Sequence, residues 1–306
     1  IVDDGERQFV VKVGADLKPV IYDENGKVRA ELPAATASDD AELAEKAQSE
    51  FKALKKALKD LEKVQTIRLE HGMVTGRRWF ADEFVNFLVN HPVMQFLLRD
   101  YVFGGFNMLG QLTGTFVILD KDNIQNIDGQ PVSLLDFGEI SLLHPLQLSD
   151  AELTKWKNIF TTHKIKQPFP QLERPVQRLL EREVNDFEVL RLAKLRIPAV
   201  VIVGTLDRHG WLLGDVTAAG IYTEHIRYFP RQDVTALIQY DGIPTGTGGV
   251  DWADQYINHC LFLSGKVAGD YDRDFQKGLQ LGTIDPVVLS EVLCDVELLK
   301  AKGSPD

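Results

Sequence analysis

Apolar and polar residues alternate near the start of the chain, as they do in a half-buried strand. The alternation runs over residues 9–13, and a second apolar stretch, 20–22, leads into Asn25 and Gly26. Because an Asn-Gly pair readily adopts the positive φ angles of a tight turn, the pattern predicts a β hairpin within residues 1–35.

The hydrophobic pattern takes on a helical period after Pro33. Ser38 is the expected N-cap, and the acidic residues that follow it suit the positive end of a helix dipole. Apolar residues then recur at steps of three and four, which predicts one amphipathic helix running to about Glu70. Its predicted buried face consists of Leu43, Ala47, Phe51, Leu54, Leu58 and Leu61.

Shorter elements follow. Aromatic residues predict a second helix over 79–88 that ends at the proline after His91, and a third over 93–101 that ends near Gly104 and Gly105. Two apolar stretches, 116–119 and 124–127, predict a β meander. A capping box at Ser149 opens a further helix that continues through Phe160.

The C-terminal part is predicted to be rich in β structure after a proline-rich break at 167–170. Residues 175–196 have a helical pattern. Strands are predicted over 200–203, 221–228, 234–240 and 256–263, and a closing helix over 286–299.

Together these elements predict an α+β fold, with a β hairpin, a helical segment and a β meander followed by a β-rich part closed by a helix. The predicted division is a mixed part, 1–166, and a β-rich part, 167–306, with a single large domain as the alternative.

Composition is that of an acidic globular protein. The chain has 306 residues, 44% of them hydrophobic, and its 34 Lys and Arg against 45 Asp and Glu give a net charge of −11. This balance excludes a largely disordered chain. The apolar runs are far shorter than the roughly 18 residues that cross a bilayer, so no membrane span is predicted.

The chain begins at Ile1, without Met and without a basic region ahead of an apolar one. We therefore expect no signal peptide and a fragment of a longer polypeptide. Two cysteines, Cys260 and Cys294, do not make a disulfide framework, which favours a cytoplasmic location.

Several motifs in a fixed order resemble a known family. They read QTIRLEHGMVTGRRWFADEF, NHPVMQFLLRDYVF, SLLHPLQLS, QPFPQLERPV and DPVVLSEVLCDVELL, and the resemblance extends from about Gly14 to the end of the chain. The family comprises the large bacterial proteins labelled molybdate metabolism regulator-like, and the chain resembles their C-terminal region, a domain of unknown function. The resemblance implies a regulator that is part of a longer polypeptide. Members often carry a WGR domain, associated with nucleic-acid binding, but no WGR domain is recognisable here.

Basic residues gather on the polar side of the long helix and just after it. Such a patch offers contacts to phosphate groups and suggests a nucleic-acid surface. The overall charge of −11 opposes binding of nucleic acid at long range, and a solvated helix face is the alternative reading. The candidate contact residues are Lys52, Lys55, Lys56, Lys59, Lys63, Arg77 and Arg78.

Asp207 and His209 are the candidate catalytic residues. They lie in a predicted turn between two β segments, where His209 is a potential general base oriented by Asp207. No nucleophile is recognisable near them, and Trp211 is expected to pack in the core. The alternative is an ordinary turn with a solvated imidazole.

Cofactor and metal motifs are absent from the sequence. The glycine-rich stretch 242–249 lacks the Lys and Ser/Thr that complete a P-loop, and the seven histidines lack metal-ligand spacing. His91 and His144 each precede a proline, which indicates fixed corners. We expect no cofactor and no metal.

The leading functional hypothesis is a non-enzymatic interaction or regulatory module of a larger cytosolic protein. Its expected partners are the remainder of the parent polypeptide and another protein. A nucleic-acid contact surface and an uncharacterised enzyme centred on Asp207 and His209 are the two alternatives.

Overall fold

The computed structural model describes residues 2–3, 7–14, 16–36, 39–246, 252–267 and 278–305. Ser38, the expected N-cap, and residues 247–249 of the glycine-rich stretch lie outside the described residues. The helices and antiparallel sheets confirm the predicted α+β class. The chain clusters into two compact units, which are described separately below. Unit 1 comprises Ile1–Met73, Arg77–Leu143 and Asp150–Leu172, and unit 2 comprises Val74–Gly76, His144–Ser149 and Glu173–Asp306.

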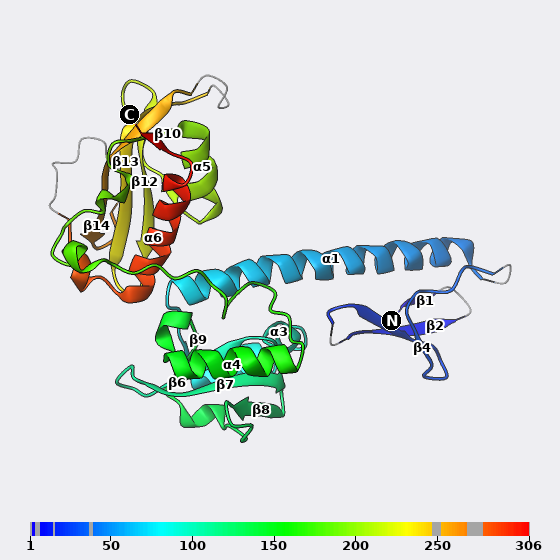
Figure 1. The fold of residues 1–306 in the computed structure, drawn as a ribbon. Coiled ribbons are helices and arrows are strands. Elements are labelled where there is room, and N and C mark those ends of the chain that lie inside the picture. The colour runs from blue at the N-terminus through cyan, green and yellow to red at the C-terminus, as the bar shows by residue number, and fades with distance from the viewer. Residues whose placement is uncertain are drawn as a thin grey trace. The chain divides into compact units, whose positions relative to one another are not determined.

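Unit 1 begins with a small antiparallel sheet, as the alternating pattern predicts (Figure 1). Its described strands, in spatial order, are β1 (Val2–Asp3), β2 (Gln8–Val13), β3 (Pro19–Tyr22) and β4 (Val28–Arg29). The turn between β3 and β4 contains Gly26 at a φ of 75°, a conformation that glycine adopts at little cost. The predicted hairpin is therefore confirmed.

Helix α1 (Ala41–Val74) follows and has 34 residues. Its N-cap is Asp40, whose carboxylate accepts a hydrogen bond from the backbone N–H of Leu43 at 3.0 Å. Phe51 is buried against Phe9 and Ile21 of the sheet. The predicted buried face is wrong at Leu43, which is 40% exposed, because the helix turns Ala44 inward in its place.

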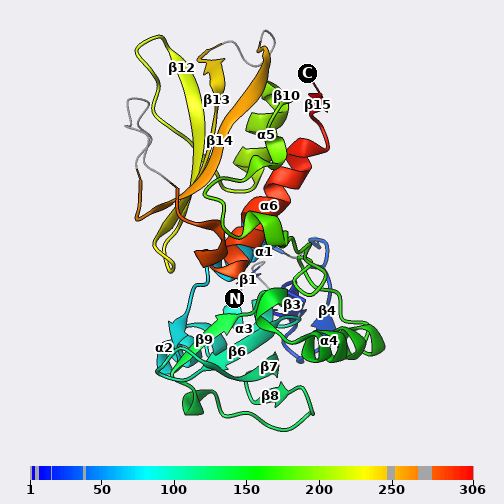
Figure 2. The same ribbon diagram turned by 60° about the vertical axis from the view of Figure 1, so that its left-hand side comes forward.

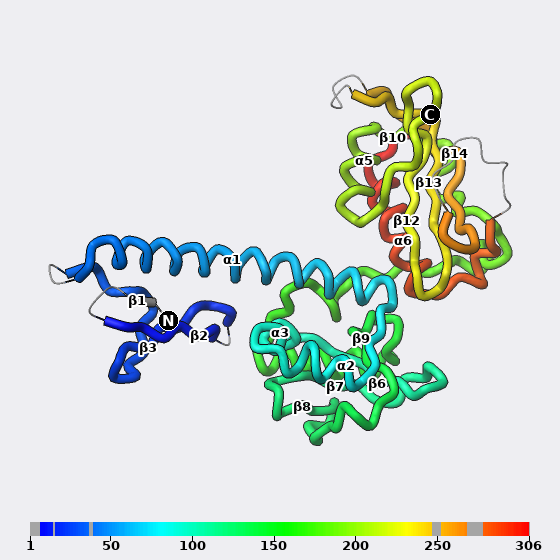
Figure 3. The backbone as a smooth tube through the Cα atoms, turned by 180° about the vertical axis from the view of Figure 1, so that it is seen from behind, coloured from blue at the N-terminus to red at the C-terminus, as the bar shows by residue number. Residues whose placement is uncertain are grey.

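The rest of unit 1 is a sheet with a helix on each face. Phe84 of α2 lies with its ring centroid 5.4 Å from that of Phe103 on one face. On the other face, the indole N–H of Trp156 in α4 donates to Thr115 at 3.1 Å (Figures 1 and 3). The described strands, in spatial order, are β5 (Trp79–Phe80), β9 (Glu139–Leu142), β6 (Val102–Phe106), β7 (Leu112–Asp120) and β8 (Asn123–Asn126). The helical segments are α2 (Ala81–Phe84), η1 (Val85–Val89), α3 (Met94–Leu97), η2 (Leu134–Asp136) and α4 (Asp150–Thr162).

Two predictions for unit 1 are corrected, while the meander and the helix after Ser149 are confirmed. The second helix begins at Ala81 and not at Trp79, because Trp79 pairs with Ile140 in the sheet. Gly104 and Gly105 do not end a helix but lie inside β6. Glycine is needed at 105 because a Cβ there would lie 2.2 Å from a ring carbon of Phe137.

Unit 2 is built on an antiparallel sheet whose one face is covered by α5 (Ala199–Arg208) and α6 (Pro286–Lys300) (Figure 2). The long strands and the closing helix confirm the predicted pattern. The described strands, in spatial order, are β11 (Leu212–Leu213), β12 (Ile221–Phe229), β13 (Val234–Pro244), β14 (Asp254–Ser264), β10 (Leu195–Pro198) and β15 (Ser304–Pro305). Short helical turns are η3 (Pro145–Gln147), η4 (Glu181–Glu183), η5 (Leu190–Leu192) and η6 (Leu281–Thr283).

Two predictions for unit 2 are wrong. Residues 175–196 are mostly irregular, because their backbone groups bond to distant segments: the N–H of Val189 donates to Cys260 O at 2.7 Å. The β-branched run 200–203 is not a strand but part of α5, in which Ala199, Ile202 and Leu206 are buried at helical spacing. Packing of these residues in the core outweighs the strand preference of valine.

Truncation of Leu58 tests the buried face of α1. Leu58 is buried, so Leu58→Ala should lower the free energy of unfolding by about 2–5 kcal/mol. Leu43→Ala, at an exposed position of the same helix, is the matched control and should change it by less than about 0.5 kcal/mol. Urea denaturation of the three proteins gives the comparison, and equal losses in both variants would contradict the assigned face.

Candidate functional site

The polar residues of helix α6 mark the candidate site in unit 2. Ser290, Glu291 and Asp295 are almost completely buried among the apolar residues of this helix. Glu291 and Asp295 are four residues apart and therefore share one side of the helix. Because a buried carboxylate needs hydrogen-bond donors and positive charge around it, the partners of these two residues define the site.

Asp295 gathers three donors from two segments. The indole N–H of Trp211 donates to Oδ2 at 2.7 Å, and the guanidinium of Arg227 on β12 donates to the same oxygen at 3.1 Å. The second oxygen, Oδ1, contacts Nδ1 of His209, which follows the end of α5. Asp295 therefore fixes the imidazole of His209, whose side chain is 38% exposed.

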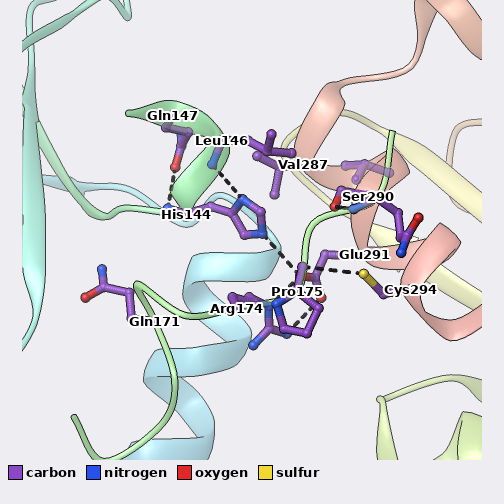
Figure 4. Close-up of polar contacts among 12 residues, drawn as sticks. His144, Leu146, Gln147, Gln171, Arg174, Pro175, Val287, Ser290, Glu291 and Cys294 are labelled. Carbon is purple, nitrogen blue, oxygen red and sulfur yellow. Dashed lines mark hydrogen bonds and ion pairs between the residues drawn. The ribbon is translucent and has the colours of Figure 1, made fainter. Parts of the chain in front are cut away.

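Glu291 lies one helical turn earlier and is held by Arg174 (Figure 4). Two guanidinium nitrogens of Arg174 donate to the two carboxylate oxygens at 2.5 and 2.8 Å, and Arg227 lies 3.9 Å away. Burial alone would raise the pKa of Glu291, but the hydrogen bonds from Arg174 and His144 outweigh it and lower this pKa to about 2. Glu291 is therefore ionised over the physiological range.

His144 connects η3 to the same carboxylate. Its Nδ1 accepts a hydrogen bond from the N–H of Leu146 at 3.2 Å, and Gln147 accepts from the His144 N–H at 2.9 Å. Since Nδ1 is an acceptor, the ring proton lies on Nε2, which is 3.3 Å from Glu291 (Figure 4). The predicted fixed corner at His144 is confirmed, and His91 caps its own turn in the same way.

Asp207 belongs to a second polar chain. His225 is fully buried, with its Nε2 3.5 Å from Asp207 and its Nδ1 3.0 Å from the hydroxyl of Tyr240. Burial lowers the pKa of His225 to about 4, although the nearby Asp207 carboxylate opposes that shift. The imidazole is therefore neutral at pH 7, with Tyr240 donating to Nδ1 and the Nε2 proton directed to Asp207.

The two candidate catalytic residues, Asp207 and His209, therefore have different partners in the structure. His209 is oriented by Asp295, and Asp207 lies against His225 with a side chain that is 52% exposed. These residues are at the end of α5 and not in a turn between strands. Trp211 is buried, as expected. Catalysis by Asp207 or His209 stays a prediction.

The predicted basic contact residues fall into two groups, which differ in whether they interact with other described side chains of unit 1. Lys52, Lys56, Lys59 and Lys63 are exposed on one side of α1 and form no ion pair within the described residues. Lys55 pairs with Glu31 at 2.5 Å. The two arginines are engaged inside unit 1: Arg77 lies over the ring of Trp79, and Arg78 bonds to Glu139 at 2.9 Å and to Gly110 O at 3.2 Å.

Sequence reasoning missed Glu291, Asp295 and Arg227. A signal was present, because two carboxylates four residues apart interrupt the apolar positions of the predicted closing helix and an arginine follows an isoleucine in a predicted strand. Charges in such positions indicate buried ion pairs. Their partners, however, are between 64 and 147 residues away along the chain, so no local pattern identifies them.

Metal sites and membrane-spanning helices were sought among the residues that the structure describes. These residues contain no group of three or more His, Cys, Asp or Glu side chains arranged to hold a metal ion. Among them, no helix combines the length and apolar character needed to cross a membrane.

Comparisons with known proteins give a family and one relative. Residues 26–211 match a family described as "Domain of unknown function (DUF4132)". The Escherichia coli (strain K12) protein named "Uncharacterized protein YehI" is 30% identical over 174 residues, which cover 56% of this chain but 14% of that protein. The chain thus aligns with a small part of its relative's length. No solved structure matches the chain.

Titration of His225 should make stability depend on pH. The unfolded histidine titrates near 6.5 and the folded one near 4, so the unfolded state binds the extra proton between these values. The free energy of unfolding should therefore decrease as the pH is lowered from 6.5 to 4, by on the order of 3 kcal/mol.

Urea midpoints of the wild type and of His225→Gln, measured from pH 7 to 4, test this expectation. The variant lacks the titrating ring, so its midpoint should change less over that range. Parallel pH profiles of the two proteins would contradict the assignment.

Proposed function

Because the chain belongs to the family described as Domain of unknown function (DUF4132), whose description names no activity, we propose from its structure that it is a non-enzymatic interaction module of a longer protein. One observation carries this proposal. Helix α1 exposes four lysines that form no ion pair with any described residue, together with Val64 and Ile67, which are 45% and 56% exposed. Neighbouring exposed apolar side chains are one feature of a contact surface, and charge beside them favours a partner of opposite charge.

The arrangement of unit 2 supports the same proposal. Glu291 and Asp295 form ion pairs with Arg174 and Arg227 in the core, so these charges are used to hold α6 on the sheet. The residues that face solvent, Asp207 and His209, are bound to different partners. A general base needs a reacting group within hydrogen-bond reach, and among the described residues no hydrogen bond joins His209 to a Ser, Thr or Cys side chain.

The partners we propose are the remainder of the parent polypeptide and another protein. A regulatory role rests on the resemblance to the molybdate metabolism regulator-like proteins, some of which carry a WGR domain. A cytoplasmic location is supported by Cys260 and Cys294, which are both free thiols.

Two alternatives each have an observation in their favour. The exposed lysines of α1, which have no ion-pair partner in the part of the chain that the structure describes, favour a nucleic-acid surface, against which the net charge of −11 acts. The buried Asp295 and half-exposed His209 favour an enzyme, because a carboxylate on Nδ1 leaves Nε2 of the imidazole available as a base.

Crosslinking in cells tests the interaction module against the enzyme. The full-length parent protein carrying Ile67→Glu should lose crosslinked partners that the wild type retains, because the substitution places a charge on the exposed apolar surface. His209→Gln should retain them. Leu298→Glu, at an exposed position of α6, is the matched control.

Thermal stability of the same proteins shows whether each variant is folded. A stable His209→Gln protein that has lost the cellular role of the parent, with all crosslinks intact, would favour the enzyme.

Titration with duplex and single-stranded DNA tests the nucleic-acid alternative. Because the chain is acidic, we expect dissociation constants weaker than about 1 μM at physiological salt, within the range of nonspecific binding. The variant with Lys52, Lys56, Lys59 and Lys63 changed to Glu is the control. Submicromolar affinity that this variant loses would replace the leading proposal.

A further inference from the structure

Helix α1 has a second apolar strip, separate from its buried face. Residues 53, 57, 60, 64 and 67 recur at steps of four, three, four and three, which is the spacing of a coiled-coil seam. All five are exposed, whereas Ala47, Phe51 and Leu58 on another side of the helix are buried. This outer seam consists of Ala53, Ala57, Asp60, Val64 and Ile67.

The outer seam is about 21 Å long at a rise of 1.5 Å per residue. Lysines border one side of it, since Lys56 precedes Ala57 and Lys63 precedes Val64 in the positions that coiled coils use for ion pairs between helices. Leu54 and Leu61, both half-buried, lie on the other side. The face therefore combines small and branched apolar residues with a positive border.

We propose that the outer seam docks a helix of another protein that carries carboxylates beside its own apolar seam. This inference rests on the proposed interaction function and names the chemistry of the partner. Carboxylates on that helix would pair with Lys56 and Lys63, which have no ion-pair partner within the described residues. A basic or amide residue would face Asp60.

Charge argues against a second copy of this chain as the occupant. In an antiparallel pair centred on Asp60, Lys56 would face Lys63 of the other copy, and the two Asp60 side chains would meet. In a parallel pair, Lys63 would face Arg68, and the Asp60 side chains would again meet. Both arrangements place like charges together, which disfavours self-association.

Asp60 also argues against a lipid surface. A helix that lies in a bilayer interface has a continuous apolar face of large residues. Here a carboxylate interrupts the outer seam, and two of its members are alanines, which suit close approach of another helix.

Two synthetic helical peptides of about three heptads test the proposal with the 306-residue chain. Both have Leu at the a and d positions, apart from one Asn to face Asp60. The acidic peptide has Glu at the e and g positions, and the control has Lys there; like charges keep either peptide from pairing with itself. The wild-type chain should bind the acidic peptide at least tenfold more tightly.

Variants of the chain locate the binding. The double variant Lys56→Glu, Lys63→Glu should reverse the preference, and Ile67→Glu should weaken binding of the acidic peptide at least tenfold. Leu298→Glu should bind like the wild type. If Ile67→Glu does not fold, as judged by circular dichroism, the charge-reversed double variant decides the result alone.

Three results would overturn the proposal. One is equal or undetectable binding of the two peptides. Another is a dimer of the wild-type chain in sedimentation that Ile67→Glu abolishes, since the occupant would then be a second copy. The third is displacement of the acidic peptide by duplex DNA or by anionic vesicles. If the peptides do not bind as expected while crosslinking in cells still depends on Ile67, the proposed chemistry of the partner is rejected and the interaction function is retained.

Discussion

The burial of two carboxylates on one helix is the constraint on which unit 2 depends. Taking Glu291 and Asp295 out of water costs several kcal/mol per ion unless donors replace the lost solvent. Arg227 of β12 lies within ion-pair distance of both carboxylates, so it joins α6 to the sheet. Trp211 and His209 fix the end of α5 to the same helix through Asp295.

The motifs that carry the family resemblance supply many of these polar contacts. The stretch 141–149 contributes His144, and 167–176 contributes Arg174, both of which meet Glu291 on the stretch 285–299. In unit 1, Gln171 of the same proline-rich motif accepts from Val102 N–H at 2.8 Å and donates to the carbonyls of Val102 and Leu143 at 2.7 and 2.8 Å. The motifs therefore contribute to how the fold is held together.

Helix α1 has two strips of apolar residues, of which one is buried and the other is exposed. One strip is buried against the N-terminal strands through Phe51. The outer seam keeps Val64 and Ile67 exposed beside lysines that have no carboxylate partner within the described residues. A helix with a second patterned face has the means to hold a partner without any change in its own packing, which is the basis of both proposals.

The sequence alone determined the elements whose signal is local. The hairpin at Gly26, the long helix, the three long strands of unit 2 and the closing helix follow from turn chemistry and from periods of two or 3.6 residues, which need only neighbouring residues. His144 belongs with them, because a histidine that caps its own turn needs no distant partner.

The tertiary structure decided what depends on contacts between distant residues. It turned the valine run 200–203 into a helix and left 175–196 irregular, since core packing and backbone bonds to other strands outweigh local preference. It also gave His209 the carboxylate of Asp295, 86 residues away, in place of the neighbouring Asp207. A periodic pattern reports which side of an element is buried, but the partner that meets a buried charge is fixed only when the whole chain has folded.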